Sequence, residues 1–194
     1  MAIIAKENFL HWNYYIALEE DLSKISRYIE FSEDNFNVYS IELAHLLLAA
    51  SSEIDVVLKA LCNIINPSKK HKNINDYQRT IKDKLSNLIN EPCYIHRYGL
   101  ELNPSTNWNN DENPHWWKDY NDVKHERDIN FNKANLKNTL NALSALNLTI
   151  IYYYKAFYEK VGKSLKFKEV TTKLEPKPSL IKANSDYYYD NLVV

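Results

Sequence analysis

The chain has 194 residues, of which 45% are hydrophobic, and this is enough to form one domain with a core that needs no disulfide or metal. Its 24 basic and 25 acidic residues leave a formal net charge of -1, so a nucleic-acid partner would require local basic patches. Only two glycines occur, Gly99 and Gly162, which excludes glycine-rich phosphate loops and argues against most β-rich folds.

Cysteine usage and the N-terminus indicate the compartment. Cys62 and Cys93 occur in apolar or mixed surroundings without CxxC spacing, which predicts reduced, buried thiols rather than a disulfide framework or a zinc site. Residues 1–6 lack the apolar core of a signal peptide, and no apolar run approaches the length of a membrane span. We therefore expect a soluble, cytoplasmic protein without membrane contacts.

Apolar residues recur at helical spacing in several long segments, which predicts an all-α fold. The expected architecture is a bundle of about four to five helices, covering residues 7–31, 41–65, 76–90, 114–127 and 133–161. The second helix is apolar on most sides, as is typical of the centre of a bundle. Its polar minority forms one narrow stripe, which is either the solvent face, the interpretation we favour, or a shared polar site: His45, Ser52, Asp55 and Lys59.

The remaining segments predict loops and a tail. Residues 68–72 form a basic connection after Pro67, and residues 92–113 have the composition of a long loop with little regular structure. Beyond Gly162, two prolines exclude a continuous helix. We therefore divide the chain into a helical domain, residues 1–162, and an extended, nonhelical C-terminal tail, residues 163–194, that packs on the bundle or reaches a partner through its terminal tyrosines.

The helix expected over residues 114–127, PHWWKDYNDVKHER, carries the candidate functional residues. On a helix of 3.6 residues per turn, Trp116, Tyr120 and Val123 fall on one stripe. The opposite side carries Lys118, Asn121, Asp122 and His125. One face is therefore suited to packing, and the other is either an ordinary solvated face or a site for chemistry.

The run Tyr120-Asn121-Asp122-Val123-Lys124-His125, between two helices, resembles the motif of the HEPN superfamily. That motif has an arginine, often followed by asparagine, four to six residues before a histidine. Asn121 and His125 match it, whereas Tyr120 stands where the arginine is expected. The longer stretches WNYYIALEEDLSKISRYIEFSEDNF and PHWWKDYNDVKHERDINF are also similar to a group of bacterial proteins of unassigned function.

The resemblance implies metal-independent RNA cleavage by a homodimer whose motifs face each other, with roles in phage defence and toxin–antitoxin systems. His125 would act as general acid or base on the ribose 2′-hydroxyl. Asn121 would orient the imidazole or the phosphate. Lys118 would replace the missing arginine, without its bidentate fork, with Lys124 or Arg127 as less well-placed candidates. A weaker or lost nuclease is the expected consequence. Phosphate contacts are expected from Lys69, Lys70, Lys72, Lys124 and Arg127.

Two other interpretations compete with this one. His115, Asp119, Asp122, His125 and Glu126 share a broad sector of one helix, but a single helix rarely supplies a complete metal site and no HExxH spacing is present, so we expect no metal or cofactor. The stronger competitor is a noncatalytic helical module that binds a partner protein or a nucleotide. It is favoured by Tyr120 in the arginine position, by the near-neutral charge and by the many aromatic residues.

Overall fold

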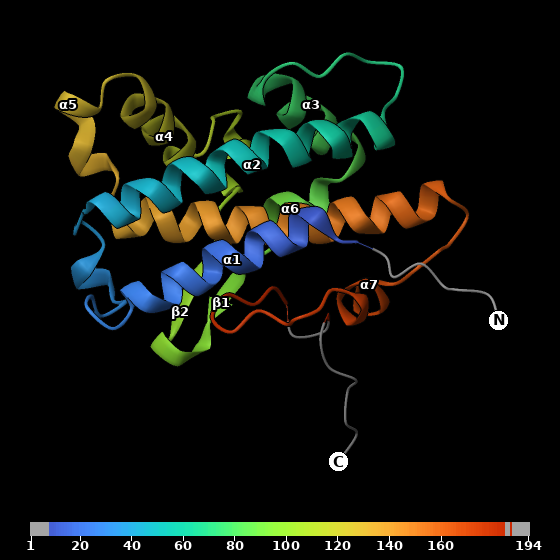
Figure 1. Cartoon of the computed structure of the whole chain (residues 1–194). Helices are drawn as coiled ribbons and strands as arrows, with labels where there is room; N and C mark the ends of the chain where they lie inside the picture. Colours follow the sequence, from blue (N-terminus) through green and yellow to red (C-terminus); the bar gives the residue numbers. More distant parts are fainter. Residues whose placement is uncertain (1–7, 185–186, 188–194) are drawn as a thin grey trace.

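The computed structural model describes residues 8–184 and 187, and this part of the chain is mostly helical, as predicted (Figure 1). Within it lie seven α-helices: α1 (Leu10–Ile25), α2 (Ile41–Ile65), α3 (Ile74–Lys84), α4 (His115–His125), α5 (Arg127–Asn130), α6 (Leu136–Lys160) and α7 (Phe167–Lys173). The described residues also contain a two-stranded antiparallel hairpin, β1 (Cys93–Ile95) and β2 (Leu100–Leu102). None of the helices among the described residues combines the length and the hydrophobicity that a membrane span requires.

The two longest helices, α2 and α6, form the centre of the molecule and run side by side in the same direction (Figure 1). Each starts at a capping side chain, because the Ser40 hydroxyl accepts a hydrogen bond from the Leu43 N–H at 3.1 Å and Asn135 caps α6 in the same way. Near these starts, the Thr139 hydroxyl donates to the Leu43 carbonyl at 3.2 Å. Every residue from 142 to 152 of α6 is buried, so this helix is enclosed by the rest of the chain.

Helices α1 and α4 pack on opposite sides of this central pair (Figure 1). The start of α1 lies beside the middle of α2, where His11 contacts Glu53, and its end lies beside the start of α2, where Ile25 and Glu42 line one pocket, so α1 runs antiparallel to α2. Trp12, Tyr15 and Leu22 of α1 are buried against the pair. The apolar stripe read from the sequence therefore becomes the packing face of the helix.

Two predicted helices are shorter than expected. The first ends at Ile25 rather than near residue 31, and the chain continues from there in a series of turns. The third ends at Lys84, where Leu85 leaves the helical region at φ -148° and ψ 41°, and a 3-10 helix, η2 (Ser86–Asn90), follows. The helix predicted over residues 41–65 has the same bounds as α2.

The segment predicted to be an irregular loop contains the β1–β2 hairpin. Cys93 pairs with Leu102 and Ile95 with Leu100, with Gly99 between the strands at φ 64°, a left-handed conformation that suits glycine. Both strands have only three residues, which is too short for alternation to stand out in the sequence. The hairpin and its following turns bring Pro104 against α4, which matters for the candidate site below.

The C-terminal tail was predicted to be nonhelical, and this is wrong for residues 167–173, which form α7. The two prolines end helical structure only after this segment, while the Glu169 carboxylate accepts the Lys166 N–H at 2.7 Å and so caps its first turn. After α7 the chain is extended and packs on the domain. The Lys182 backbone bridges to Tyr94 of β1, and Trp12 donates to the Pro176 carbonyl at 3.0 Å. Tyr188 and Tyr189 lie outside the described residues.

Both thiols are buried and unpaired, as expected. Burial raises the pKa of Cys62 to about 12, with a smaller contribution from Asp76, and it also raises the pKa of Cys93. Neither thiol is therefore suited to act as a nucleophile near neutral pH.

Candidate functional site

Helix α4 is firmly positioned by its aromatic residues. Pro114 precedes its first residue, and Trp116, Trp117, Tyr120 and Val123 are buried. The Trp116 indole N–H donates to the Pro104 carbonyl at 2.7 Å, which ties the helix to the segment after the hairpin. The indole rings of Trp116 and Trp117 meet edge to face at 5.8 Å between centroids.

The three candidate catalytic residues lie on the accessible side of α4. Lys118 and His125 are exposed and Asn121 is half-buried. Their spacing of three, four and seven residues puts them on one side of the helix, as predicted. Within the described part of the chain, no hydrogen bond or ion pair holds the His125 ring or the Lys118 ammonium group. The Asn121 amide donates to the Trp117 carbonyl at 2.8 Å, which leaves its side-chain oxygen available to a ligand.

The acidic residues of α4 are occupied by contacts that fix the helix. Lys133 lies 2.5 Å from an Asp122 carboxylate oxygen and 3.8 Å from one of Asp119, while the Asn138 amide donates to Asp119 at 2.7 Å. The hydrogen bond with Asp122 is the main cause that raises the pKa of Lys133. Among the described residues, no group of three or more His, Cys, Asp and Glu side chains is close enough to hold a metal ion.

Tyr120, in the position where the HEPN motif has arginine, is a core residue with 5% of its surface exposed. Its ring lies 5.3 Å from that of Trp117, and the Lys124 ammonium group is 5.4 Å from the Tyr120 ring centroid. The side chain is therefore part of the packing face, and a cation for this site has to come from another position.

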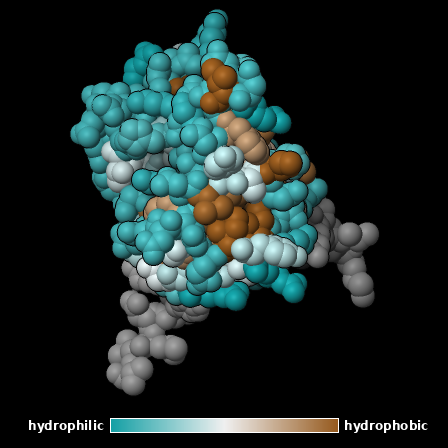
Figure 2. Space-filling model, turned by 90° about the vertical axis from the view of Figure 1, so that its left-hand side faces the viewer, coloured by the Kyte–Doolittle hydropathy of each residue, from teal (hydrophilic) through white to brown (hydrophobic). Residues whose placement is uncertain are grey.

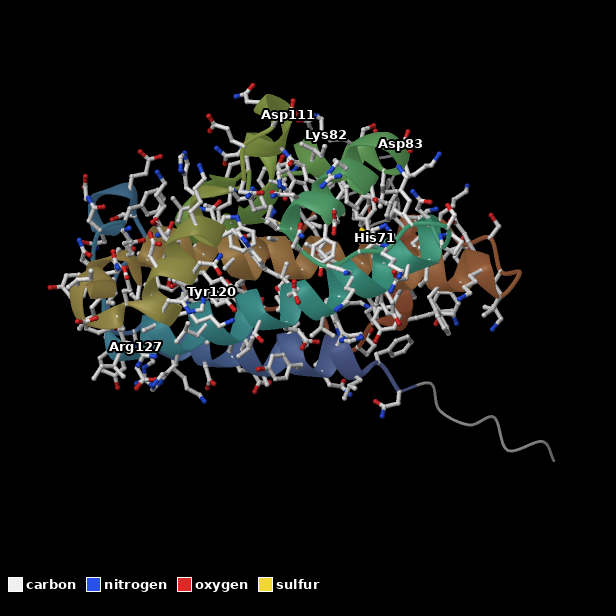
Figure 3. All side chains as sticks on the ribbon, turned by 90° about the horizontal axis from the view of Figure 1, so that it is seen from above. His71, Lys82, Asp83, Asp111, Tyr120 and Arg127 are labelled. Carbon is white, nitrogen blue, oxygen red and sulfur yellow. The ribbon has the colours of Figure 1, made fainter. Side chains whose placement is uncertain are left out.

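A pocket of about 320 Å³ lies where α5 meets the start of α2 (Figure 3). Its apolar wall consists of Ile41, Ala44 and Phe131, and its polar rim of His45, Arg127 and Asp128. Arg127 follows the last residue of α4 by two positions, so the pocket adjoins the end of the helix that carries His125. Within residues 8–184 and 187, Arg127 makes no ion pair. We refer to this site as the end pocket.

The contribution of His45 to this site does not follow from the sequence. It was assigned to the solvent face of the second helix, and its side chain is indeed exposed, with a Glu42 carboxylate oxygen 3.7 Å away. In the structure, however, it shares the end pocket with Arg127, which is more than 80 positions later in the chain. The polar stripe that includes His45 was the only signal in the sequence, and it did not reveal this neighbour.

The end pocket is surrounded by apolar side chains on the outside of the molecule. Figure 2, which faces this end, shows hydrophobic residues gathered within a hydrophilic surround. Ile41 is 63% exposed and Ile129 of α5 is 72% exposed. The Phe131 ring is held edge-on by Tyr39 at 5.4 Å. We call Tyr39, Ile41, Ile129 and Phe131 the end surface. Exposed apolar groups concentrated in this way are typical of contact surfaces.

The candidate RNA-binding residues fall into two separate groups. Lys124 and Arg127 lie at the end of α4 and the start of α5, whereas Lys69, Lys70 and Lys72 are in the connection after α2. With 25 residues, α2 is about 37 Å long, and it separates the two groups. His71, within the second group, is buried, with its ring nitrogens 2.9 Å from Asn63 and 3.0 Å from Thr80 (Figure 3). It therefore anchors the connection that displays the lysines.

Comparison of the chain with models of known protein families, with curated proteins and with solved structures gave no match.

Proposed function

We propose that this protein is an HEPN-like, RNA-directed helical protein of bacterial defence or toxin type, and that it cleaves RNA without metal at the end of α4. The observation that carries the proposal is an exposed histidine, His125, followed two residues later by Arg127, which makes no ion pair among the described residues and lies beside a pocket that also contains His45. Attack of a ribose 2′-hydroxyl on phosphorus requires proton transfer and a cation near the phosphoryl oxygens.

In this proposal His125 accepts the proton of the 2′-hydroxyl as that oxygen bonds to phosphorus, and a proton is returned to the 5′-oxygen as the phosphorus–5′-oxygen bond breaks. A histidine is suited to this because it can gain and lose a proton near neutral pH. The Asn121 side-chain oxygen, one turn earlier, orients the imidazole or the ribose hydroxyl. Arg127 and Lys118 supply the positive charge on either side of His125, which compensates for a tyrosine in the arginine position. Arg127 is the stronger candidate, since its planar guanidinium can bind two phosphate oxygens at once.

The proposed architecture is a four-helix bundle of α1, α2, α4 and α6, with the remaining helices on its edges. Bundles commonly present functional side chains at their ends and between facing helices. The parallel course of the central pair supports this grouping, because it brings the starts of α2 and α6 to the end where α4 finishes.

The proposed homodimer would use the end surface. The exposed Ile41 and Ile129 provide apolar area, and the surrounding charges have both signs, with Glu42 beside His45 and Asp128 beside Arg127. A twofold interface pairs a surface with itself, so a surface with both signs is self-complementary. Such a dimer would bring two copies of the α4 site close together.

A noncatalytic module that binds a protein or nucleotide is the second candidate. It is favoured by the burial of Tyr120 and by the absence, within the described residues, of a side chain that fixes the His125 ring. A catalytic histidine is usually oriented by a hydrogen-bond partner, although substrate binding can provide it.

Cleavage of a mixed RNA pool in EDTA distinguishes the candidates. Wild-type protein is compared with Arg127→Ala, with Lys118→Ala and with the control Arg97→Ala, which changes an exposed arginine outside the end pocket. Loss of a group that stabilises the transition state should lower the cleavage rate by roughly a hundredfold for Arg127→Ala, with little change for the control. RNA binding without cleavage by the wild type would favour the noncatalytic module.

A further inference from the structure

A second pocket, far from the α4 site, is lined mostly by aromatic side chains. It has a volume of about 350 Å³ and lies between the start of α1 and the last turns of α6. Its lining residues are, besides Asn8, Leu10 and His11, the aromatic residues Phe9, Tyr153, Tyr154, Phe157 and Tyr158. We call it the aromatic pocket. Because α2 and α6 run in the same direction, it lies at the opposite end of the central pair from the end pocket.

Three pairs of neighbouring rings meet at steep angles, whereas Tyr153 and Phe157 are tilted by only 31°, with 6.4 Å between their centroids, and so share one face. Tyr153 and Tyr154 meet at 66°, Phe157 and Tyr158 at 68°, and Phe9 and Tyr154 at 85°. The Phe9 ring packs edge-on against Tyr154 at 5.1 Å between centroids, which ties that ring to the start of α1. The walls are therefore in place before a ligand binds.

Two polar groups of the lining are available at the edge of these walls. The His11 ring lies edge-on to Tyr153, at 5.3 Å between centroids, and its Nδ1 atom is 2.5 Å from a Glu53 carboxylate oxygen. His11 and Glu53 side chains are each only 17% exposed, so this pair is fixed in place. Within the described residues, neither the His11 Nε2 atom nor the Tyr153 hydroxyl has a hydrogen-bond partner. Both can therefore bind a ligand.

We propose that the aromatic pocket binds a single nucleobase, presented either by a free nucleotide or by an unstacked base of single-stranded RNA. A base has two flat faces that stack on aromatic rings and an edge of hydrogen-bond donors and acceptors. The base stacks on the face shared by Tyr153 and Phe157 and its edge is bound by His11 Nε2, while the Tyr153 hydroxyl, which lies in the plane of the ring below the base, binds the ribose or phosphate. The pocket volume is within the range of small-molecule sites.

A base explains this lining better than an organic cation does. Aromatic walls also suit a quaternary cation, which a nearby free carboxylate would attract further. The carboxylate beside this pocket, Glu53, is already bound to His11. The remaining imidazole nitrogen matches the polar edge of a heteroaromatic ring.

The experiment measures binding by isothermal titration calorimetry to the full chain. The ligands are the four nucleoside monophosphates, single-stranded RNA tetramers of each base, and tetramethylammonium. Phe157→Leu and Tyr153→Leu each remove a stacking ring, and Tyr153→Phe removes only the hydroxyl. The matched control is Tyr14→Leu, which changes an exposed tyrosine of α1 outside the pocket. Thermal melting checks that each variant is folded.

We expect a monophosphate or a tetramer to bind the wild type and Tyr14→Leu equally. Either ring deletion should weaken binding on the order of tenfold, and Tyr153→Phe should weaken it less. Binding of monophosphates identifies a free nucleotide as the ligand, and binding of tetramers alone identifies RNA. Equal affinity in the wild type and both folded ring deletions, a preference for tetramethylammonium, or no nucleotide binding at all would overturn the proposal.

This inference shares with the proposed function only a nucleic-acid component as ligand, so the two can fail separately. His125→Ala should bind the base with unchanged affinity, because His125 lies at the other end of the central pair. RNA cleavage without base binding would overturn only the proposal that the aromatic pocket binds a base. Base binding without cleavage would overturn only the proposal that the protein is a ribonuclease.

Discussion

Glu19 on α1 holds the backbone of Leu180, 161 positions later in the chain: its carboxylate accepts the Leu180 N–H at 2.8 Å. The same carboxylate accepts the N–H groups of Ser179 and Ile181 and the Ser179 hydroxyl. With only 1% of its surface exposed, Glu19 is a buried acid whose partners are backbone groups of the tail. The tail is thereby attached to the domain along α1.

Loss of this carboxylate should destabilise the protein strongly. Glu19→Ala leaves three backbone N–H groups without an acceptor, at least two of them buried, so we expect the free energy of unfolding to fall by about 3–5 kcal/mol. Urea denaturation measures the change. The control is Glu20→Ala, which removes the exposed neighbouring acid and should cost less than about 0.5 kcal/mol. Equal stability of the two variants would contradict this role of the tail.

Replacing Tyr120 by the arginine of the HEPN motif should destabilise the protein rather than increase RNA cleavage. Tyr120→Arg would put an uncompensated charge into the packing face of α4, against Trp117 and near Lys124, and should destabilise the protein by at least about 2 kcal/mol. Tyr120→Phe is the matched control. The Tyr120 hydroxyl makes no hydrogen bond within the described residues, so its removal should be nearly neutral. A Tyr120→Arg protein as stable as the wild type in thermal melting would contradict the assignment of Tyr120 to the core.

Alkaline pH should destabilise the fold. Burial raises the pKa of Cys62 and Tyr154 to about 12, and it also raises the pKa values of Cys93, Tyr152 and Tyr187. These groups are neutral in the folded state, and the unfolded chain ionises first, near its usual values of 9.0 and 10.0. The contribution of these neutral groups to the free energy of unfolding is complete below pH 9, and it is lost as the pH rises towards 12.

The urea midpoint should therefore be lower at about pH 10.5 than at about pH 8, and a thiol reagent at about pH 8 should label Cys62 and Cys93 only after unfolding. An unchanged midpoint together with rapid labelling of the native protein would show that these groups are accessible.

The two basic groups at opposite ends of α2 should bind different phosphates of one RNA. Replacement of Lys69, Lys70 and Lys72 by alanine should reduce the slope of log affinity against log salt by about 2 for a long single strand. The reduction should disappear for an oligonucleotide too short to extend from the end pocket along α2. Fluorescence anisotropy measures both affinities. An identical slope of log affinity against log salt in the wild type and the triple variant would show that these lysines do not contact the RNA.

The main helices could be predicted from the sequence because local signals mark where they begin and end. Residues 41–65 were predicted with the right bounds, since Ser40 caps the helix and Pro67 excludes its continuation. The errors arose where tertiary contacts decide. The hairpin is short and is stabilised by its bridge to Lys182, and α7 is packed through Phe167, whose ring stacks on Tyr187 at 4.4 Å. Neither contact is visible in a local pattern.

The candidate site was predictable in part for the same reason. Lys118, Asn121 and His125 share one helix, so their common side follows from residue spacing alone. The meeting of His45 with Arg127 depends on how α5 packs against the start of α2, and sequence periodicity carries no information about such a long-range contact. The burial of Tyr120 was predicted from its stripe. That a cation for the site has to come from a position other than 120 became clear only from the structure.

The role of His125 in RNA cleavage can be tested by comparing two histidines of the same helix. His125→Ala and His115→Ala both remove an exposed imidazole from α4, at its last and first residue. In EDTA, with folding checked by circular dichroism, cleavage of an RNA pool should be lost in His125→Ala, by at least about a hundredfold, and retained in His115→Ala. Equal cleavage by both variants, or none by the wild type, would contradict this role of His125.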